Sequence, residues 1–282
     1  MGRTALVLML TVLYLKPIGA VTSGADMSTA PGRDVVPERP MLLPAVLDPD
    51  SQEILSKVQA AYANIASLEC TGTLIIDSEI AGRVEQSNKP FYTAYHIPNK
   101  FRYELGRELV TGCTGSDAYL HQVTRNQYTT TAEHPKGDQA TLVIPSAIVQ
   151  ILETNNPLLL ALLNRQPSSI WEKWAHSFHR NDDVRIDSKL CYCLGMELRQ
   201  QAGFGQLYID CQSFLIRRVV FDRKTGYERS GMIGVKKALF EIDYAKIRSG
   251  YPFATSAFQW SPPSEAKCVG EQTVLQSLIK AP

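Results

Sequence analysis

The chain has 282 residues, of which 44% are hydrophobic and 20% are charged, and its formal net charge is +1 at pH 7. This is the composition of an ordinary globular protein. A nearly neutral chain without a stripe of Lys and Arg gives no electrostatic case for nucleic-acid binding, and no sequence repeat indicates a solenoid or a propeller.

Residues 1–25 have the pattern of a secretory signal peptide. Arg3 supplies a short positive region, residues 5–15 form an apolar run, and Ala20 and Ala25 are plausible cleavage points. The run is too short to cross a bilayer core of about 30 Å as a helix. Lys16 follows the run directly, so an uncleaved N-terminal anchor remains the alternative. No cysteine lies near the cleavage points, so the sequence does not indicate a lipoprotein. We therefore predict an exported protein of the periplasm or cell envelope.

Export would change the interpretation of the cysteines, because an oxidising compartment permits disulfides. Their even number does not reveal connectivity. Cys191 and Cys193 stand two positions apart on a predicted strand, so their side chains point to the same side and should not bond each other. A zinc site would need a second close pair of ligands, and the sequence has none. A Cys193–Cys211 bridge would require a β-bulge, so free or singly bridged structural cysteines are favoured. The six are Cys70, Cys113, Cys191, Cys193, Cys211 and Cys268.

The folded domain begins near residue 48. Residues 26–47 are rich in Pro, Ser, Gly and Ala without periodicity, which is typical of a flexible linker. Asp50 and Glu53 then match a capping box, and residues 51–68 carry apolar side chains at helical spacing. The pattern predicts an amphipathic helix with one side against an apolar surface.

From Leu68 to about Tyr128 the apolar period changes to two. LECTGTLIID (68–77) and KFRYEL (100–105) alternate apolar with polar residues, and Gly and Pro residues separate these runs. Short alternating runs joined by tight turns predict an antiparallel meander with one apolar and one wet face.

Residues 146–178 predict three short helices between two strand regions. The first follows Pro145, the second restarts at Asn156–Pro157, and the third opens with a Ser169–Glu172 capping box. PLLLALL (157–163), in the second, has no charged face and is too short to span a membrane. We interpret it as a lid over a cavity that touches the membrane transiently during ligand transfer.

After Asp183 the alternation returns, with GFG (203–205) as a predicted hairpin turn. The order helix, strands, helices, strands predicts one α+β domain over 48–270, followed by a C-terminal tail at 271–282. We expect a curved antiparallel sheet, an open half-barrel, with helices packed on its concave face.

Four motifs in order resemble those of the LolA-like periplasmic lipoprotein-carrier and outer-membrane lipoprotein-sorting superfamily. They are HIPNKFRYEL (96–105), GSDAYLHQVTRNQYT (115–129), LYIDCQSFLIRRVVF (207–221) and SAFQWSPPSEAKCV (256–269), the last similar to a terminal strand. The resemblance implies an unclosed β-barrel with helices in its mouth and an apolar cavity that accepts acyl chains. Because this chain departs from the carriers in its cysteines and its tryptophan-richer lid, neither cargo nor partner is carried over.

The apolar faces of the predicted helices and strands, together with the resemblance, predict a non-catalytic protein that binds a lipid or an acylated ligand under helical lids, without cofactor or metal. The alternatives are a solid core without a cavity, and an envelope interaction or regulatory protein that uses the same fold as a sensor or scaffold for an envelope partner. The residues predicted to line cavity and lid are Leu74, Ile76, Phe101, Tyr103, Tyr192, Leu194, Met196, Leu207, Ile209, Phe240, Ile242, Ile148, Ile151, Leu152, Leu159, Leu160, Leu163, Trp171, Trp174 and Phe178.

No pattern singles out catalysis. The chain contains neither G-x-S-x-G nor a phosphate-binding glycine loop. His176 and His179 would share a face of the third predicted helix, but no third ligand stands at a defined spacing, so we interpret them as polar positions at a helix end. A hydrolase is the least favoured hypothesis, and we predict no enzyme activity.

Overall fold

The computed structural model describes residues 45–132, 144–164, 173–199 and 202–279. The predicted signal peptide, most of the linker, the Ser169–Glu172 capping box and Trp171 lie outside these residues. Among the described helices, none is both long and apolar enough to cross a membrane.

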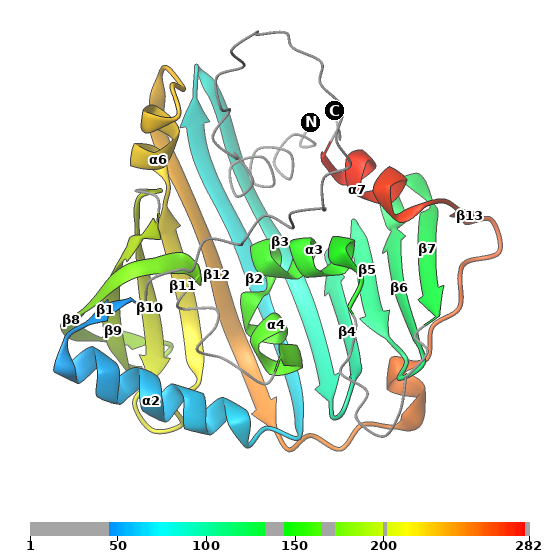
Figure 1. The fold of residues 1–282 in the computed structure, drawn as a ribbon, viewed down its shortest axis with the longest axis horizontal. Coiled ribbons are helices and arrows are strands. Elements are labelled where there is room, and N and C mark those ends of the chain that lie inside the picture. The colour runs from blue at the N-terminus through cyan, green and yellow to red at the C-terminus, as the bar shows by residue number, and fades with distance from the viewer. Residues whose placement is uncertain (1–44, 133–143, 165–172, 200–201, 280–282) are drawn as a thin grey trace, which may run out of the picture.

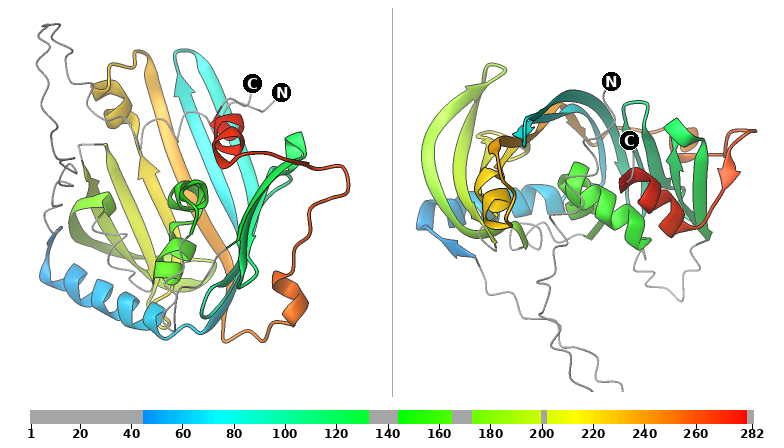
Figure 2. Two further views of the ribbon diagram at one scale, coloured as in Figure 1. Left: turned by 45° about the vertical axis from the view of Figure 1, so that its right-hand side comes forward. Right: turned by 90° about the horizontal axis from the view of Figure 1, so that it is seen from above.

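The strands form one 13-stranded sheet in the order β1-β8-β9-β10-β11-β12-β2-β3-β4-β5-β6-β7-β13. Two antiparallel meanders, β2–β7 and β8–β12, join where β12 pairs with β2, and only the two-residue edge strands β1 and β13 pair in parallel. The sheet is open and strongly curved (Figures 1 and 2), as predicted. The strands are β1 (Val46–Leu47), β2 (Ser67–Ile80), β3 (Arg83–His96), β4 (Lys100–Leu105), β5 (Leu109–Cys113), β6 (Asp117–Gln122), β7 (Gln127–Ala132), β8 (Ala175–Ile186), β9 (Lys189–Leu198), β10 (Phe204–Asp210), β11 (Ile216–Asp222), β12 (Val235–Ser249) and β13 (Lys267–Cys268).

The helices lie mainly on the concave side. Figure 1 shows α3 and α4 over the middle of the sheet and α2 along its lower end, and α7 contacts β6 and β7. The helical elements are α2 (Pro49–Ala63), α3 (Ser146–Asn155), α4 (Pro157–Asn164), α6 (Lys224–Arg229) and α7 (Glu271–Ile279), with 3-10 turns η1 (Val123–Arg125) and η3 (Thr255–Phe258).

The predicted faces of strand β2 are confirmed. In β2 the residues Leu68, Cys70, Leu74 and Ile76 are buried while those between them are mostly half-buried. A strand alternates its side chains between two faces, so a period of two places every second residue in the core. The local pattern therefore predicted which side of β2 faces the core, whereas in β9 Cys193 and Gly195, predicted on the wet face, are buried as well.

The start of α2 differs from the prediction. The N-cap is Asp48 rather than Asp50: its carboxylate accepts a hydrogen bond from the Ser51 backbone N at 2.8 Å, and Pro49 occupies the first helical position. The second carboxylate oxygen accepts from the Arg180 backbone N at 2.8 Å, which ties α2 to β8. These hydrogen bonds, that of Ser51 first, lower the pKa of Asp48.

The third predicted helix is wrong over residues 175–178. Ala175–Ile186 is strand β8, and Phe178 pairs with Met196 of β9. Tertiary pairing overrides local helical spacing here, because β9 supplies antiparallel partners along β8, with two register shifts. His176 sits at a β-bulge, and the ring of His179 covers Gly195, where a Cβ would clash with it. Because both histidines lie in a strand, the helix face that they were predicted to share does not form.

Three further expectations change. Residues 271–279, assigned to a tail, form α7, whose Val274 and Leu275 are buried in the main core. The terminal strand implied over 256–269 is reduced to two residues, β13. Only Gly203 of GFG adopts a turn conformation, with φ of 121°, while Gly205 already lies in β10.

Candidate ligand-binding site

The concave face and the helices on it form one apolar cluster. Side chains from both meanders and from α2, α3, α4 and α7 contribute to it. Trp174 and Tyr192 are half-buried and pack against the cluster, and Trp171 lies outside the described residues. Their location together is as expected, and their ligand-binding role stays a prediction. The predicted residues inside the cluster are Leu74, Ile76, Phe101, Tyr103, Ile148, Ile151, Leu152, Leu159, Leu160, Leu163, Phe178, Leu194, Met196, Leu207, Ile209, Phe240 and Ile242.

Helix α4 is enclosed on all sides. Every residue from Pro157 to Leu163 is buried, and the most exposed of them, Leu163, retains only 8% of its accessible surface. A helix presents side chains around its whole circumference, so one that is apolar all round must be enclosed to be stable in water. In this state PLLLALL belongs to the core and does not face a membrane.

The predicted acyl-chain cavity is not confirmed. The described residues bound a hollow of about 10 Å³, between β6, β7, α3 and α7. A space of this size holds about one water molecule. We call α3 and α4, which lie over the middle of the concave face, the lid. The residues around the hollow are Ala118, Tyr119, Leu120, Thr129, Thr131, Pro145, Ala147, Ile148 and Glu271.

A buried polar contact holds the break between the two lid helices. Asn156 Nδ2 donates to Thr93 Oγ1 of β3 at 2.7 Å, and the Tyr244 hydroxyl of β12 donates to Asn156 Oδ1 at 3.4 Å. The same Oδ1 accepts from the Leu159 backbone N at 3.2 Å, which caps the first turn of α4. We call this group, with Tyr95, Tyr103 and Asn155, the lid seam.

The remaining contacts of the lid seam are long. The Tyr95 hydroxyl reaches the Leu162 carbonyl at 3.4 Å, and the Tyr103 hydroxyl reaches the Asn155 carbonyl at 3.5 Å. Burial raises the pKa of Tyr103 and of Tyr244, so both stay protonated donors. Hydrogen bonds of this length are weak. Asn155 Oδ1 is buried without a partner, an arrangement that costs about 1–3 kcal/mol.

Unlike a wholly apolar interface, this seam contains polar groups whose contacts in the closed state are partly long or missing. Opening exposes leucines, which is unfavourable, but it also returns poorly paired polar groups to water. Water then satisfies Asn155 Oδ1 and replaces the long tyrosine contacts.

A second anchor of the lid comes from the C-terminal helix. Glu271 Oε1 accepts from the Ala147 backbone N at 2.6 Å and from Ser146 Oγ at 3.0 Å. A carboxylate at this position satisfies an unpaired N–H of the first turn of α3 and interacts favourably with its dipole. Glu271 thus joins α7 to the lid.

Potential metal ligands and thiols are scattered over the described residues. No group of three or more His, Cys, Asp and Glu residues is arranged to hold a metal within the described ranges. None of the six cysteines, all of which lie within the described residues, forms a disulfide in this structure. Burial raises the pKa of Cys70 to about 12 and also raises that of Cys191, Cys193 and Cys211, which disfavours the nucleophilic thiolate.

The sequence alone did not single out the polar members of the site. Thr93, Tyr95, Tyr244 and Glu271 lie far along the chain from the lid residues that they contact. The one available signal was the Asn156–Pro157 restart, where an amide precedes a helix in an otherwise apolar stretch.

Comparison with known proteins gives structural matches only. No family model and no curated protein matches the chain. Similar solved structures include an uncharacterised conserved protein from Thermus thermophilus, at 13% identity and a TM-score of 0.44, covering 78% of this chain and 98% of that one. LprF from Mycobacterium bovis has 10% identity and a TM-score of 0.40, covering 78% and 98%.

A LolA superfamily protein from Nitrosomonas europaea is also among the structures to which the chain is similar. The identity is 10% and the TM-score 0.30, with 74% of this chain and 97% of that one covered. Similarity at this level describes the fold, and the function is argued below from the chain's own residues.

Proposed function

We propose that the protein is an exported, non-catalytic binding protein that holds a lipid or acylated ligand between the concave face of the sheet and the lid. The observation that carries this proposal is the lid itself. Helix α4 is apolar on every side, and it lies on the sheet through the weak and incompletely paired lid seam.

The energetics of exchange support it. Each methylene of an acyl chain buried on the concave face contributes about 0.8 kcal/mol. A chain lying between lid and sheet replaces the leucine contacts that opening breaks, and it leaves the polar groups of the seam free to bind water. The apolar face of the displaced lid then covers the ligand.

A covalently closed lid tests this proposal. Thr93 and Asn156 touch through their side chains, so the double variant T93C/N156C places two thiols across the seam. When oxidised, it should lose uptake of a fluorescent fatty acid at least tenfold, and reduction should restore it. Wild-type protein under the same two conditions is the control for the native cysteines. Unchanged uptake by the oxidised variant would count against entry beneath the lid.

One observation favours a second candidate, an envelope interaction protein. Val84, Phe204 and Ile233 are 66%, 56% and 89% exposed. Val84 pairs with Glu79 beside the β2–β3 turn, which contacts Gly234 next to Ile233, and Phe204 pairs with Asp222 just before α6, so all three lie toward the end of the sheet that carries α6. Exposed apolar side chains at one end suit contact with a partner or a membrane surface. Native mass spectrometry after mild extraction, with a pull-down from envelope extract, separates the candidates: bound lipid favours the first, and a protein partner without lipid favours the second.

A further inference from the structure

Arg217 is a buried cation without a counter-ion among the described residues. It is 6% exposed and lies in β11 where the pairing with β10 is interrupted by a bulge. One terminal guanidinium nitrogen donates to the Ala245 carbonyl at 2.8 Å, while its Nε is buried without a hydrogen-bond partner. A buried charge is normally paired, so this one calls for an explanation.

The charge of Arg217 acts on the border of the apolar cluster. Its guanidinium opposes part of the rise that burial causes in the pKa of Cys70, and it does the same for Tyr62. Tyr62 of α2 also accepts a hydrogen bond from the Ile216 backbone N at 3.0 Å. Since Tyr62 and Cys70 belong to the apolar cluster, the cation lies beside it, near the C-terminal end of α2.

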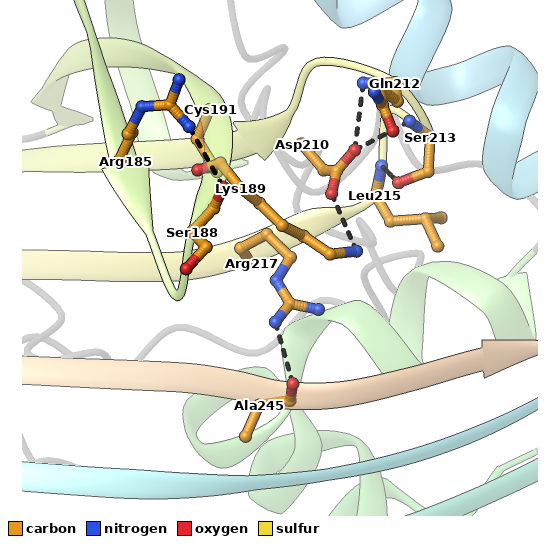
Figure 3. A network of polar contacts seen from close by, with 10 residues as sticks. All are labelled: Arg185, Ser188, Lys189, Cys191, Asp210, Gln212, Ser213, Leu215, Arg217 and Ala245. Atoms are coloured by element: carbon orange, nitrogen blue, oxygen red, sulfur yellow. Dashed lines mark hydrogen bonds and ion pairs between the residues drawn. The ribbon is translucent and has the colours of Figure 1, made fainter.

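Asp210, a carboxylate in the same neighbourhood, already has partners of its own. Asp210 is paired with Lys189 at 3.2 Å and accepts from the backbone N of Gln212 at 3.0 Å and of Ser213 at 2.9 Å. Figure 3 shows this ion pair with Arg217 in the same neighbourhood. Burial raises the pKa of Cys191, the charge of Asp210 adds to that rise and the charge of Arg217 opposes it, so both charged groups lie near this thiol. Asp210 is thus paired with Lys189 and leaves Arg217 without an ion pair among the described residues.

We propose that Arg217, assisted by Lys189, forms an anion-binding subsite for the carboxylate or phosphate group of an amphiphilic ligand. A guanidinium binds such groups through two parallel N–H donors, and the unpartnered Nε supplies one of them. Lys189, whose side chain is 54% exposed, lies toward the solvent and attracts the anion. This inference rests on the proposed function for the acyl chain and adds the chemistry of the headgroup.

Paired ligands test the subsite directly. Dodecanoate and dodecanol have the same chain and differ in charge, so their affinities for wild-type, R217Q, R218Q and K189Q protein isolate the headgroup. Arg218 is the matched control: it is the next residue, carries the same charge, and pairs instead with Glu241 and Asp243. Wild-type and R218Q protein should bind dodecanoate at least tenfold more tightly than dodecanol. R217Q should lose that preference, and K189Q should reduce it about threefold.

The outcomes separate the two proposals. Equal affinity of wild-type protein for both ligands would overturn the subsite and leave acyl-chain binding intact. If neither ligand binds, inorganic phosphate alone is the probe. A rise in melting temperature for wild-type and R218Q protein, absent in R217Q or reduced in K189Q, would support the subsite with a free anion as its source. No rise would overturn it. Because K189Q changes a half-exposed side chain, it carries the test even if R217Q does not fold.

Discussion

Helices α2 and α4 pack on the same sheet, but they are attached in opposite ways. Asp48 caps α2 with short hydrogen bonds and joins it to β8, and Tyr62 accepts a hydrogen bond from β11. The outer side of α2 is polar, with an ion pair between Lys57 and Glu53. Helix α4 has no polar side, and its links to the sheet include one short hydrogen bond, from the capping residue Asn156 to Thr93, and a long contact from Tyr95.

The proposed entry of a ligand beneath the lid assigns different roles to these two helices. An amphipathic helix with a water-facing side loses apolar burial when it leaves the sheet and gains nothing. A wholly apolar helix also loses burial, but a lipid or a membrane can replace its contacts. We therefore expect α2 to stay fixed while α3 and α4 open.

The largest expected effect comes from removing one leucine on each side of the interface. Leu74 of β2 and Leu160 of α4 are 0% and 2% exposed. L74A should lower the free energy of unfolding by about 3 kcal/mol. L160A should lower the free energy of unfolding by only about 1 kcal/mol, because the lid can open while the rest of the domain stays folded. Its apparent affinity for a fatty acid should rise several-fold, because the open lid admits the ligand. Chemical denaturation and fluorescent fatty-acid titration measure both. Equal losses without a gain in affinity would mean that α4 is ordinary core.

The N-cap of α2 should have the next largest effect. D48A should lower the free energy of unfolding by about 2 kcal/mol without changing ligand affinity per folded molecule. Because the folded-state pKa of Asp48 is lowered, its ionised form stabilises the fold above its ordinary pKa near 4. That contribution is lost as pH falls through the folded-state pKa. D48N keeps an acceptor but does not titrate, so its stability between pH 5 and about 3 should fall less than that of wild-type protein.

Removal of the second lid anchor should have a smaller effect. E271A takes away the acceptor of the Ala147 N–H and of Ser146 Oγ, and should lower stability by about 1 kcal/mol. Hydrogen exchange should accelerate in the first turn of α3 and stay unchanged in α2. Faster exchange in both helices would show a general loss of stability instead.

The smallest effect should come from the unpaired amide of the seam. N155A removes a buried oxygen that has no partner, so the free energy of unfolding should change by less than about 1 kcal/mol and in the stabilising direction. The closed lid should become more favourable and fatty-acid uptake slower. Stopped-flow uptake measures this, and faster uptake would contradict the role given to the seam.

The sequence by itself determined the features that depend on neighbouring residues. The period-two stripes of β2 and β12 placed Leu74, Phe240 and Ile242 in the core, and the Asn156–Pro157 restart placed the break between α3 and α4. Each follows from steric and hydrogen-bonding preferences that act within a few residues along the chain.

Only the tertiary structure decided the rest. Residues 175–178 became a strand because β9 pairs with them, and residues 271–279 became a core helix because their apolar side packs on β6 and β7. Thr93 meets Asn156 across 63 positions, and Glu271 meets Ala147 across 124. Arg217 is buried at a β-bulge, and the sequence around it predicts neither the bulge nor the burial. Contacts of this kind depend on how distant segments pack, and local sequence patterns carry no record of that packing.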